Sequence, residues 1–85
     1  MKEKMGLRVI IIGPRECGKT TFAQSLIANV DPTAVMYDWP QTPQGESWIY
    51  MAQTKHKVPL AVKNAADVVY TYVKGSNREF RESTL

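Results

Sequence analysis

A glycine-containing octapeptide between two apolar segments constrains the fold of this chain more than any other feature. Residues 13–20 read Gly-Pro-Arg-Glu-Cys-Gly-Lys-Thr. The apolar run Arg8–Ile12 before it is typical of a strand buried on both faces. Residues 21–30 after it carry an apolar stripe of Phe22, Leu26, Ile27 and Val30, which is typical of a helix packed on a sheet. The pattern G-x-x-x-x-G-K-T between a strand and a helix predicts a loop that binds phosphate.

Each part of the octapeptide has a chemical reason to be there. Glycines let backbone N–H groups curl around phosphates, and the N-terminus of the following helix adds partial positive charge. Lys19 would reach the β- and γ-phosphates of ATP, and the Thr20 hydroxyl would ligate Mg²⁺. The alternative is a turn that binds nothing. The residues predicted to bind nucleotide are Gly13, Pro14, Arg15, Glu16, Cys17, Gly18, Lys19, Thr20 and Thr21.

Length and composition indicate a single small soluble domain. The chain has 85 residues, and P-loop domains are ordinarily much longer, so residues 1–85 are interpreted as one truncated nucleotide-binding domain. No apolar run approaches the roughly 18 residues that a membrane-spanning helix needs. Cys17 is the one cysteine, which excludes an intrachain disulfide and fits a reducing, cytoplasmic compartment.

The positive charge of the chain is concentrated in its last third. The formal net charge is +3, and residues 55–85 hold six basic against three acidic side chains. A basic excess suits contact with nucleic acid, although it is also ordinary for a soluble protein. The candidate DNA-contacting residues are Lys55, Lys57, Lys63, Lys74, Arg78 and Arg81.

The remaining elements predict an α/β fold. Residues 34–37, 48–52 and 68–73 are expected to be strands, and Pro59 to begin a short helix that ends at residue 65. The expected architecture is a small three-layer, P-loop NTPase-like fold with a short, mostly parallel sheet of about four strands. Residues 74–85 are interpreted as a polar, basic tail with weak helical character.

Three segments together resemble the P-loop ATPases of the FtsK–HerA superfamily, which include viral DNA-packaging ATPases. Residues 10–22 resemble the first strand and Walker A loop of that family, and residues 35–46, with Asp38 and a Gly-Glu pair, resemble its second strand and turn. Residues 49–69 resemble its late strand, where a Gln at the strand end senses the γ-phosphate, which implies this role for Gln53. The resemblance implies an ATP-binding protein of viral or mobile-element origin that acts with Mg²⁺ and self-associates or joins a larger ATPase.

One part of the family pattern is missing. The family places a Walker B strand, which ends in an acidic pair, where this chain has only residues 39–47. Without that acid, hydrolysis is expected to be slow or absent, so the chain is a weak ATPase at best. Asp38 would replace the acid and support Mg²⁺ if its strand lies beside the first strand; otherwise Asp38 is a loop-entry residue. The alternative function is a non-catalytic nucleotide-binding module that docks on nucleic acid or on a partner.

Overall fold

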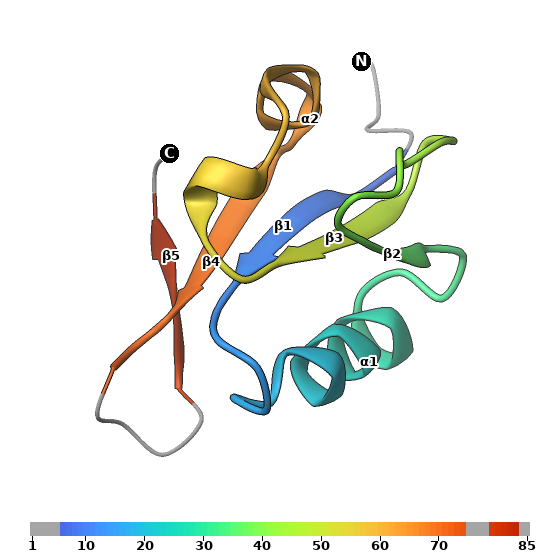
Figure 1. Cartoon of the computed structure of the whole chain (residues 1–85). Coiled ribbons are helices and arrows are strands. Elements are labelled where there is room, and N and C mark those ends of the chain that lie inside the picture. The colour runs from blue at the N-terminus through green and yellow to red at the C-terminus, as the bar shows by residue number, and fades with distance from the viewer. Residues whose placement is uncertain (1–5, 75–78, 84–85) are drawn as a thin grey trace.

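The computed structural model describes residues 6–74 and 79–83, which form a five-stranded sheet with helices on both faces (Figure 1). The strands lie in the order β2-β3-β1-β4-β5. The first four strands run parallel to one another, and β5 pairs antiparallel with β4. The elements are β1 (Arg8–Ile12), α1 (Lys19–Asn29), β2 (Val35–Asp38), β3 (Trp48–Ala52), the 3₁₀ turn η1 (Lys55–Lys57), α2 (Leu60–Ala65), β4 (Val68–Tyr72) and β5 (Phe80–Ser83).

Strand β1 lies at the centre of the sheet because its residues are apolar on both faces. Val9, Ile10 and Ile11 have no exposed surface, and neighbouring residues of a strand point to opposite faces. Ile10 pairs with Tyr50 of β3 on one side and with Val69 of β4 on the other. The run Arg8–Ile12 therefore forms the buried parallel strand that the sequence predicts.

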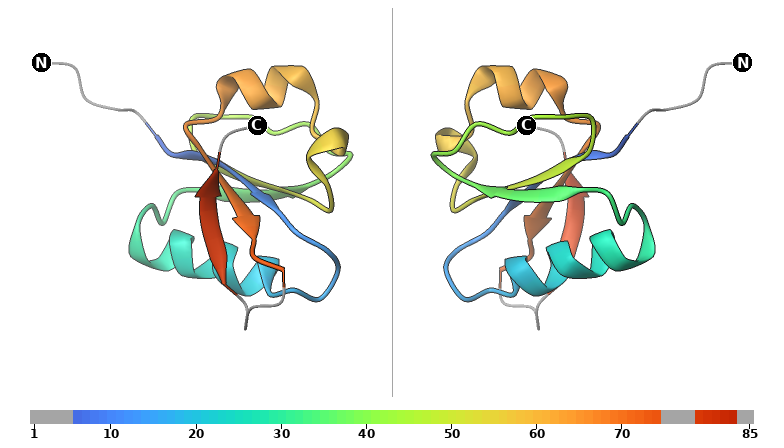
Figure 2. Two further views of the ribbon diagram at one scale, coloured as in Figure 1. Left: turned by 90° about the vertical axis from the view of Figure 1, so that its left-hand side faces the viewer. Right: turned by 90° about the vertical axis from the view of Figure 1, so that its right-hand side faces the viewer.

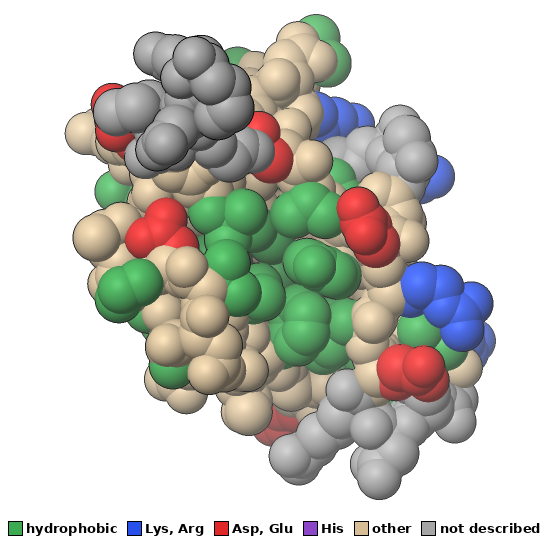
Figure 3. All heavy atoms as spheres, turned by 180° about the vertical axis from the view of Figure 1, so that it is seen from behind, with side chains coloured by type: hydrophobic (Ala, Val, Ile, Leu, Met, Phe, Trp, Pro, Cys, Tyr) green, Lys and Arg blue, Asp and Glu red, His purple; other side chains and the backbone are tan. Residues whose placement is uncertain are grey.

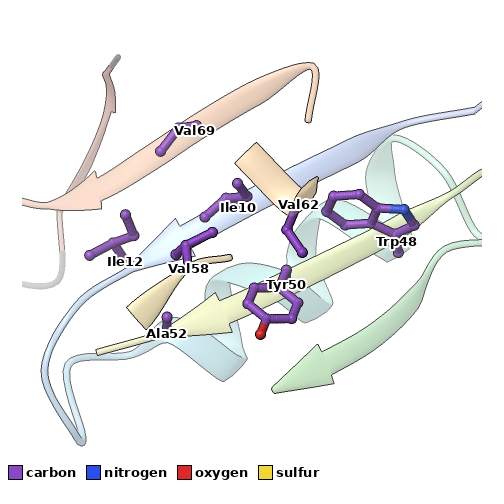
Figure 4. Close-up of a cluster of buried hydrophobic side chains, with 8 residues drawn as sticks. All are labelled: Ile10, Ile12, Trp48, Tyr50, Ala52, Val58, Val62 and Val69. Atoms are coloured by element: carbon purple, nitrogen blue, oxygen red, sulfur yellow. The ribbon is translucent and has the colours of Figure 1, made fainter. Parts of the chain in front are cut away.

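The two helices cover opposite faces of the sheet, which gives three layers (Figure 2). On the face of α2, a cluster of eight buried side chains joins the helix to three strands (Figure 4). Every member of this cluster is at most 8% exposed. The members are Ile10, Ile12, Trp48, Tyr50, Ala52, Val58, Val62 and Val69.

On the face of α1, the core is less completely covered. Six side chains are buried there, including Val9, Ile11 and Ile49. Eight further hydrophobic side chains pack against them but stay partly exposed. These are Leu7, Phe22, Leu26, Ile27, Met36, Val68, Tyr70 and Phe80.

Two sequence predictions are wrong. The segment expected to be a polar tail contains β5, so the described sheet has five strands and not about four. The ring of Phe80 stacks on Phe22 of α1 with 4.6 Å between the ring centroids. This contact joins residues far apart in the sequence, so no local sequence pattern predicts the strand. Val30 does not pack on the sheet with the rest of the predicted stripe, because α1 ends at Asn29 and Val30 is 58% exposed.

The other predicted elements are confirmed, some of them with ends shifted by one residue. Strand β3 has the expected bounds, and β2 begins and ends one residue later than expected. Pro59 caps α2 from the position before its first residue. Among the described residues, no helix is long and apolar enough to cross a membrane.

Candidate functional site: the loop between β1 and α1

The octapeptide connects the carboxyl end of the central strand to the start of the longer helix. Gly13 follows β1 directly, and its N–H donates to the carbonyl of Ala52 at the end of β3 (3.1 Å). Gly18 precedes α1, and its carbonyl accepts the first helical hydrogen bond, from the N–H of Phe22 (2.9 Å). The carboxyl edge of a parallel sheet is where α/β proteins commonly bind ligands. The loop therefore lies at the edge expected for a binding site.

Both glycines of the loop are required by its geometry. Gly18 has a φ of 96°, which residues with a Cβ rarely adopt. A Cβ on Gly13 would lie 2.6 Å from Cys17 Sγ, within the loop, and 3.0 Å from Tyr72 Cβ of β4, so the packing around Gly13 leaves no room for a side chain. Glu16 also has a positive φ, 60°, and this left-handed residue helps to close the loop.

Lys19 folds back over the loop. Its Nζ donates to the carbonyl oxygens of Gly13 (2.8 Å) and Pro14 (2.9 Å). The ammonium group is therefore held inside the curve of the backbone, beside the N-terminus of α1. Because the helix end carries partial positive charge as well, both features favour an anion at this position.

A surface hollow of about 290 Å³ lies at the start of α1. Gly18 has no side chain, so no cap from that residue occupies the N–H groups of the first helical turn. Thr20 and Thr21 are exposed at this end of the helix. The residues that line the hollow are Glu16, Gly18, Lys19, Thr20 and Thr21.

The predicted metal ligands fit Mg²⁺ only in part. Mg²⁺ is usually held by one or two protein oxygens together with substrate phosphates and waters, so the Thr20 hydroxyl suits one position. Within residues 6–74 and 79–83, no group of three His, Cys, Asp or Glu side chains could hold a metal ion. A bound Mg²⁺ would therefore take most of its remaining ligands from the nucleotide and from water.

Asp38 was expected to support Mg²⁺ only if its strand lies beside β1, and this condition is not met. Strand β2 pairs with β3, and the neighbours of β1 are β3 and β4. Asp38 thus lies two strand spacings from the end of β1, about 10 Å. The backbone of Asp38 instead anchors the following turn, because its N–H donates to Gln41 Oε1 (2.7 Å) and its carbonyl accepts from the N–H of Gln41 (2.8 Å).

The interval expected to lack a Walker B strand contains none. Residues 39–47 form turns and bends, and β2 and β3, which flank this interval, pair directly with each other. Glu46 is exposed in this connection, which joins the end of β2 to the start of β3. Because the amino end of β3 is opposite the carboxyl edge, Glu46 lies far from the loop.

Gln53 lies where the sequence places it. It follows Ala52 at the end of β3, next to the residue whose carbonyl binds Gly13. Gln53 and Thr54 are both exposed at this edge. The two residues are therefore neighbours of the loop at the carboxyl edge of the sheet.

The predicted DNA-contacting residues are spread over several elements. Lys55 and Lys57 are in η1, Lys63 is in α2, Lys74 follows β4 and Arg81 is in β5, while Arg78 lies outside the described residues. Lys57 Nζ lies 4.5 Å from the centroid of the Trp39 ring, a cation–π contact at the carboxyl edge of the sheet. His56 is exposed in the same turn, between the two lysines.

Sequence reasoning missed the aromatic group that connects the loop to the end of the chain. Phe22, in the first turn of α1, meets Tyr70 edge-on at 5.0 Å and stacks on Phe80. Tyr72, which packs against Gly13, meets Phe80 at 5.7 Å. The alternation of Tyr70 and Tyr72 on β4 was a usable signal, but the position of Phe80 depends on β5.

A comparison of the chain with protein-family models, with curated proteins and with solved structures finds no match.

Proposed function

We propose that this protein binds a nucleoside triphosphate, ATP with Mg²⁺, at the loop between β1 and α1. The observation that carries the proposal is the position of Lys19. Its ammonium group is held by the carbonyls of Gly13 and Pro14 at the N-terminus of an eleven-residue helix. A lysine, a helix end and a left-handed glycine at one sheet edge together favour a polyphosphate.

The proposed roles follow the sequence motif. Residues 13–20 would donate backbone N–H groups to the phosphates, and Lys19 would leave the loop carbonyls to pair with phosphate oxygens. Thr20 would ligate Mg²⁺, and Gln53 at the end of β3 would contact the γ-phosphate. Self-association around this edge, as in the ring-forming ATPases that the chain resembles, belongs to the same proposal.

A second candidate is a nucleotide-binding module without hydrolysis, and the place of β2 favours it. Phosphoryl transfer depends on a residue that positions or activates the attacking water and on a carboxylate that supports the metal. Asp38 is separated from β1 by the whole of β3, and residues 39–47 supply no further strand. On this second proposal, the chain binds ATP but hydrolyses it slowly or not at all. ATP would then be a regulatory or structural ligand.

Calorimetric titration with Mg-ATP tests the binding proposal. The wild-type chain is compared with Lys19→Ala and with the matched control Lys63→Ala, which removes a lysine from α2, away from the loop. We expect binding to the wild type and to the control, and at least a tenfold loss in Lys19→Ala, because a charge-assisted contact is worth about 1.5–3 kcal/mol. Equal affinity of all three proteins would reject the loop as the site.

Phosphate release measured on the same samples separates the two candidates. Release that disappears in Lys19→Ala would establish an ATPase and would require a catalytic acid from another copy or a partner. Binding without release supports the non-catalytic module. A titration with Mg-GTP beside Mg-ATP then gives the base preference.

A further inference from the structure

The face of the sheet that carries α1 leaves an apolar surface uncovered. Among the described residues, α1 is the one helix on this face, while α2 and η1 lie on the other (Figure 2). Figure 3 shows hydrophobic side chains gathered at the centre of the face seen from behind, with acidic side chains around them and Lys and Arg only at its border. Large continuous apolar patches on soluble proteins often mark binding sites.

The patch is formed by partly exposed side chains next to the buried core of this face. Val68 and Tyr70 alternate along β4, so both point to the side of α1, and Phe80 of β5 joins them. Leu7 and Leu26 adjoin the same core from the start of β1 and from α1. We call these five residues the α1-face patch.

Carboxylates surround this patch. Glu82 is exposed and pairs with Tyr70 across the β4–β5 ladder, so its side chain stands on the same face. Asp31 lies near Leu7 and Ser47; hydrogen bonds from Thr33, and then from Ser47, lower the pKa of its carboxyl group and keep it ionised.

The charge around the patch discriminates between occupants. In a two-fold dimer through this patch, the acidic border of one copy would face the acidic border of the other, which is repulsive. Nucleic acid and anionic membranes are repelled for the same reason. A partner with an apolar centre and a basic border is complementary in both respects.

The spacing of the sheet suits a helix. Strands β4 and β5 lie one and two strand spacings from β1, about 5 and 10 Å. Packed helices stand about 8–10 Å apart, which is close to the width of these two strands. In α/β folds, such positions on the sheet are covered by helices, whose apolar faces remove the sheet from water.

We propose that the α1-face patch binds an amphipathic helix of a partner protein, with Leu, Ile or Phe on its inner face and Lys or Arg along its borders. This inference is independent of nucleotide binding. Apolar contact with Tyr70, Val68 and Phe80 would supply most of the affinity, and Glu82 and Asp31 would set the preference for a basic partner.

Two synthetic helical peptides test the proposal. Both have about 18 residues with leucines on one face; one carries lysines on its polar face and the other carries glutamates. We expect the lysine peptide to bind the wild-type chain with a Kd of about 10 µM in fluorescence anisotropy, and the glutamate peptide to bind at least tenfold more weakly.

Charge reversal at the border gives the decisive comparison. Glu82→Lys should lower the affinity for the lysine peptide about tenfold and raise the affinity for the glutamate peptide. The matched control is Gln24→Lys, a positive charge on an exposed position of α1, and it should change neither affinity by more than about twofold. Tyr70→Ser, whose folding is checked by circular dichroism, should weaken both peptides, because it removes apolar contact.

Several results would overturn the proposal. Equal binding of the two peptides, or equal effects of Glu82→Lys and Gln24→Lys, would show that the border does not select the partner. A concentration-dependent dimer that Tyr70→Ser dissociates would assign the patch to a second copy. Binding to phosphatidylserine vesicles that Glu82→Lys increases and Tyr70→Ser weakens, without peptide binding, would assign it to a lipid surface.

Discussion

The two faces of the sheet differ in how completely they are covered. On the side of α2, eight buried side chains form the cluster around Tyr50, and two partly buried hydrophobic side chains, Tyr37 and Ala66, pack against it. On the side of α1, eight hydrophobic side chains stay partly exposed around a smaller buried core. The same central strand supplies both faces, so the difference comes from the covering elements and not from β1.

The difference separates stability from recognition. A side chain that is completely buried contributes its whole apolar area to folding, about 25 cal/mol per Å². A half-buried side chain keeps part of its apolar area exposed, and a binding partner can bury that area. We therefore expect substitutions on the α2 face to act mainly on the free energy of unfolding, and substitutions in the α1-face patch to act partly on binding.

The largest expected effect is at Tyr50. Truncation in Tyr50→Ala should lower the free energy of unfolding by about 3–5 kcal/mol, because the residue has no exposed surface. Tyr70→Ala, on the half-buried side, should cost about 1–2 kcal/mol. Urea denaturation measures both, and Tyr50→Leu provides a value if Tyr50→Ala does not fold. Equal losses at Tyr50 and Tyr70 would remove the distinction between the faces.

Phe80 should have the next largest effect, because it attaches β5 to α1. Phe80→Ala removes the stacking on Phe22 and should cost about 1–3 kcal/mol. Ser83→Ala in the same strand removes an exposed hydroxyl contact with Thr71 and should stay within about 0.5 kcal/mol. Hydrogen exchange at β5 should accelerate in Phe80→Ala and not in Ser83→Ala; similar exchange in both would mean that β5 is held by its ladder alone.

A smaller and opposite effect is expected from Tyr50→Phe. Among the described residues, the Tyr50 hydroxyl is buried without a hydrogen-bond partner, which costs free energy in the folded state. Its removal should leave stability unchanged or raise it by up to about 1 kcal/mol, in contrast to Tyr50→Ala. Burial, and then the charge of Asp38, raises the pKa of this hydroxyl. The folded state therefore retains the proton longer than the unfolded state, so wild-type stability should fall as pH rises above about 10, and Tyr50→Phe should lose this dependence.

The smallest expected effect is at Asp31 and concerns pH. Because the Thr33 hydrogen bond lowers the pKa of Asp31, its contribution is present above the unfolded value of 3.8 and is lost as pH falls through the lowered value. Urea midpoints between about pH 2 and 5 should fall less steeply in Asp31→Asn than in the wild type. Parallel curves would show that Asp31 titrates alike in the folded and unfolded chains.

Local sequence patterns were sufficient for most elements but not for their arrangement. Strands β1 and β3 were predicted with correct bounds because each is a continuous apolar run. Strand β5 was missed because Phe80–Ser83 contains one apolar residue, and its partner and its packing on Phe22 are both distant in sequence. The place of Asp38 depends on strand order, which no pattern along the chain encodes.

The sequence by itself determined the local chemistry of the candidate site. A glycine that can adopt a φ of 96°, a lysine and two threonines stand between a buried strand and a helix, and these properties depend on residue type and on near neighbours. The tertiary structure alone decided that β3 separates Asp38 from β1, that β5 completes the sheet, and that Glu82 stands beside an uncovered apolar face. The physical reason is that strand pairing and burial are set by contacts between distant segments, whose free energies depend on how the whole sheet packs.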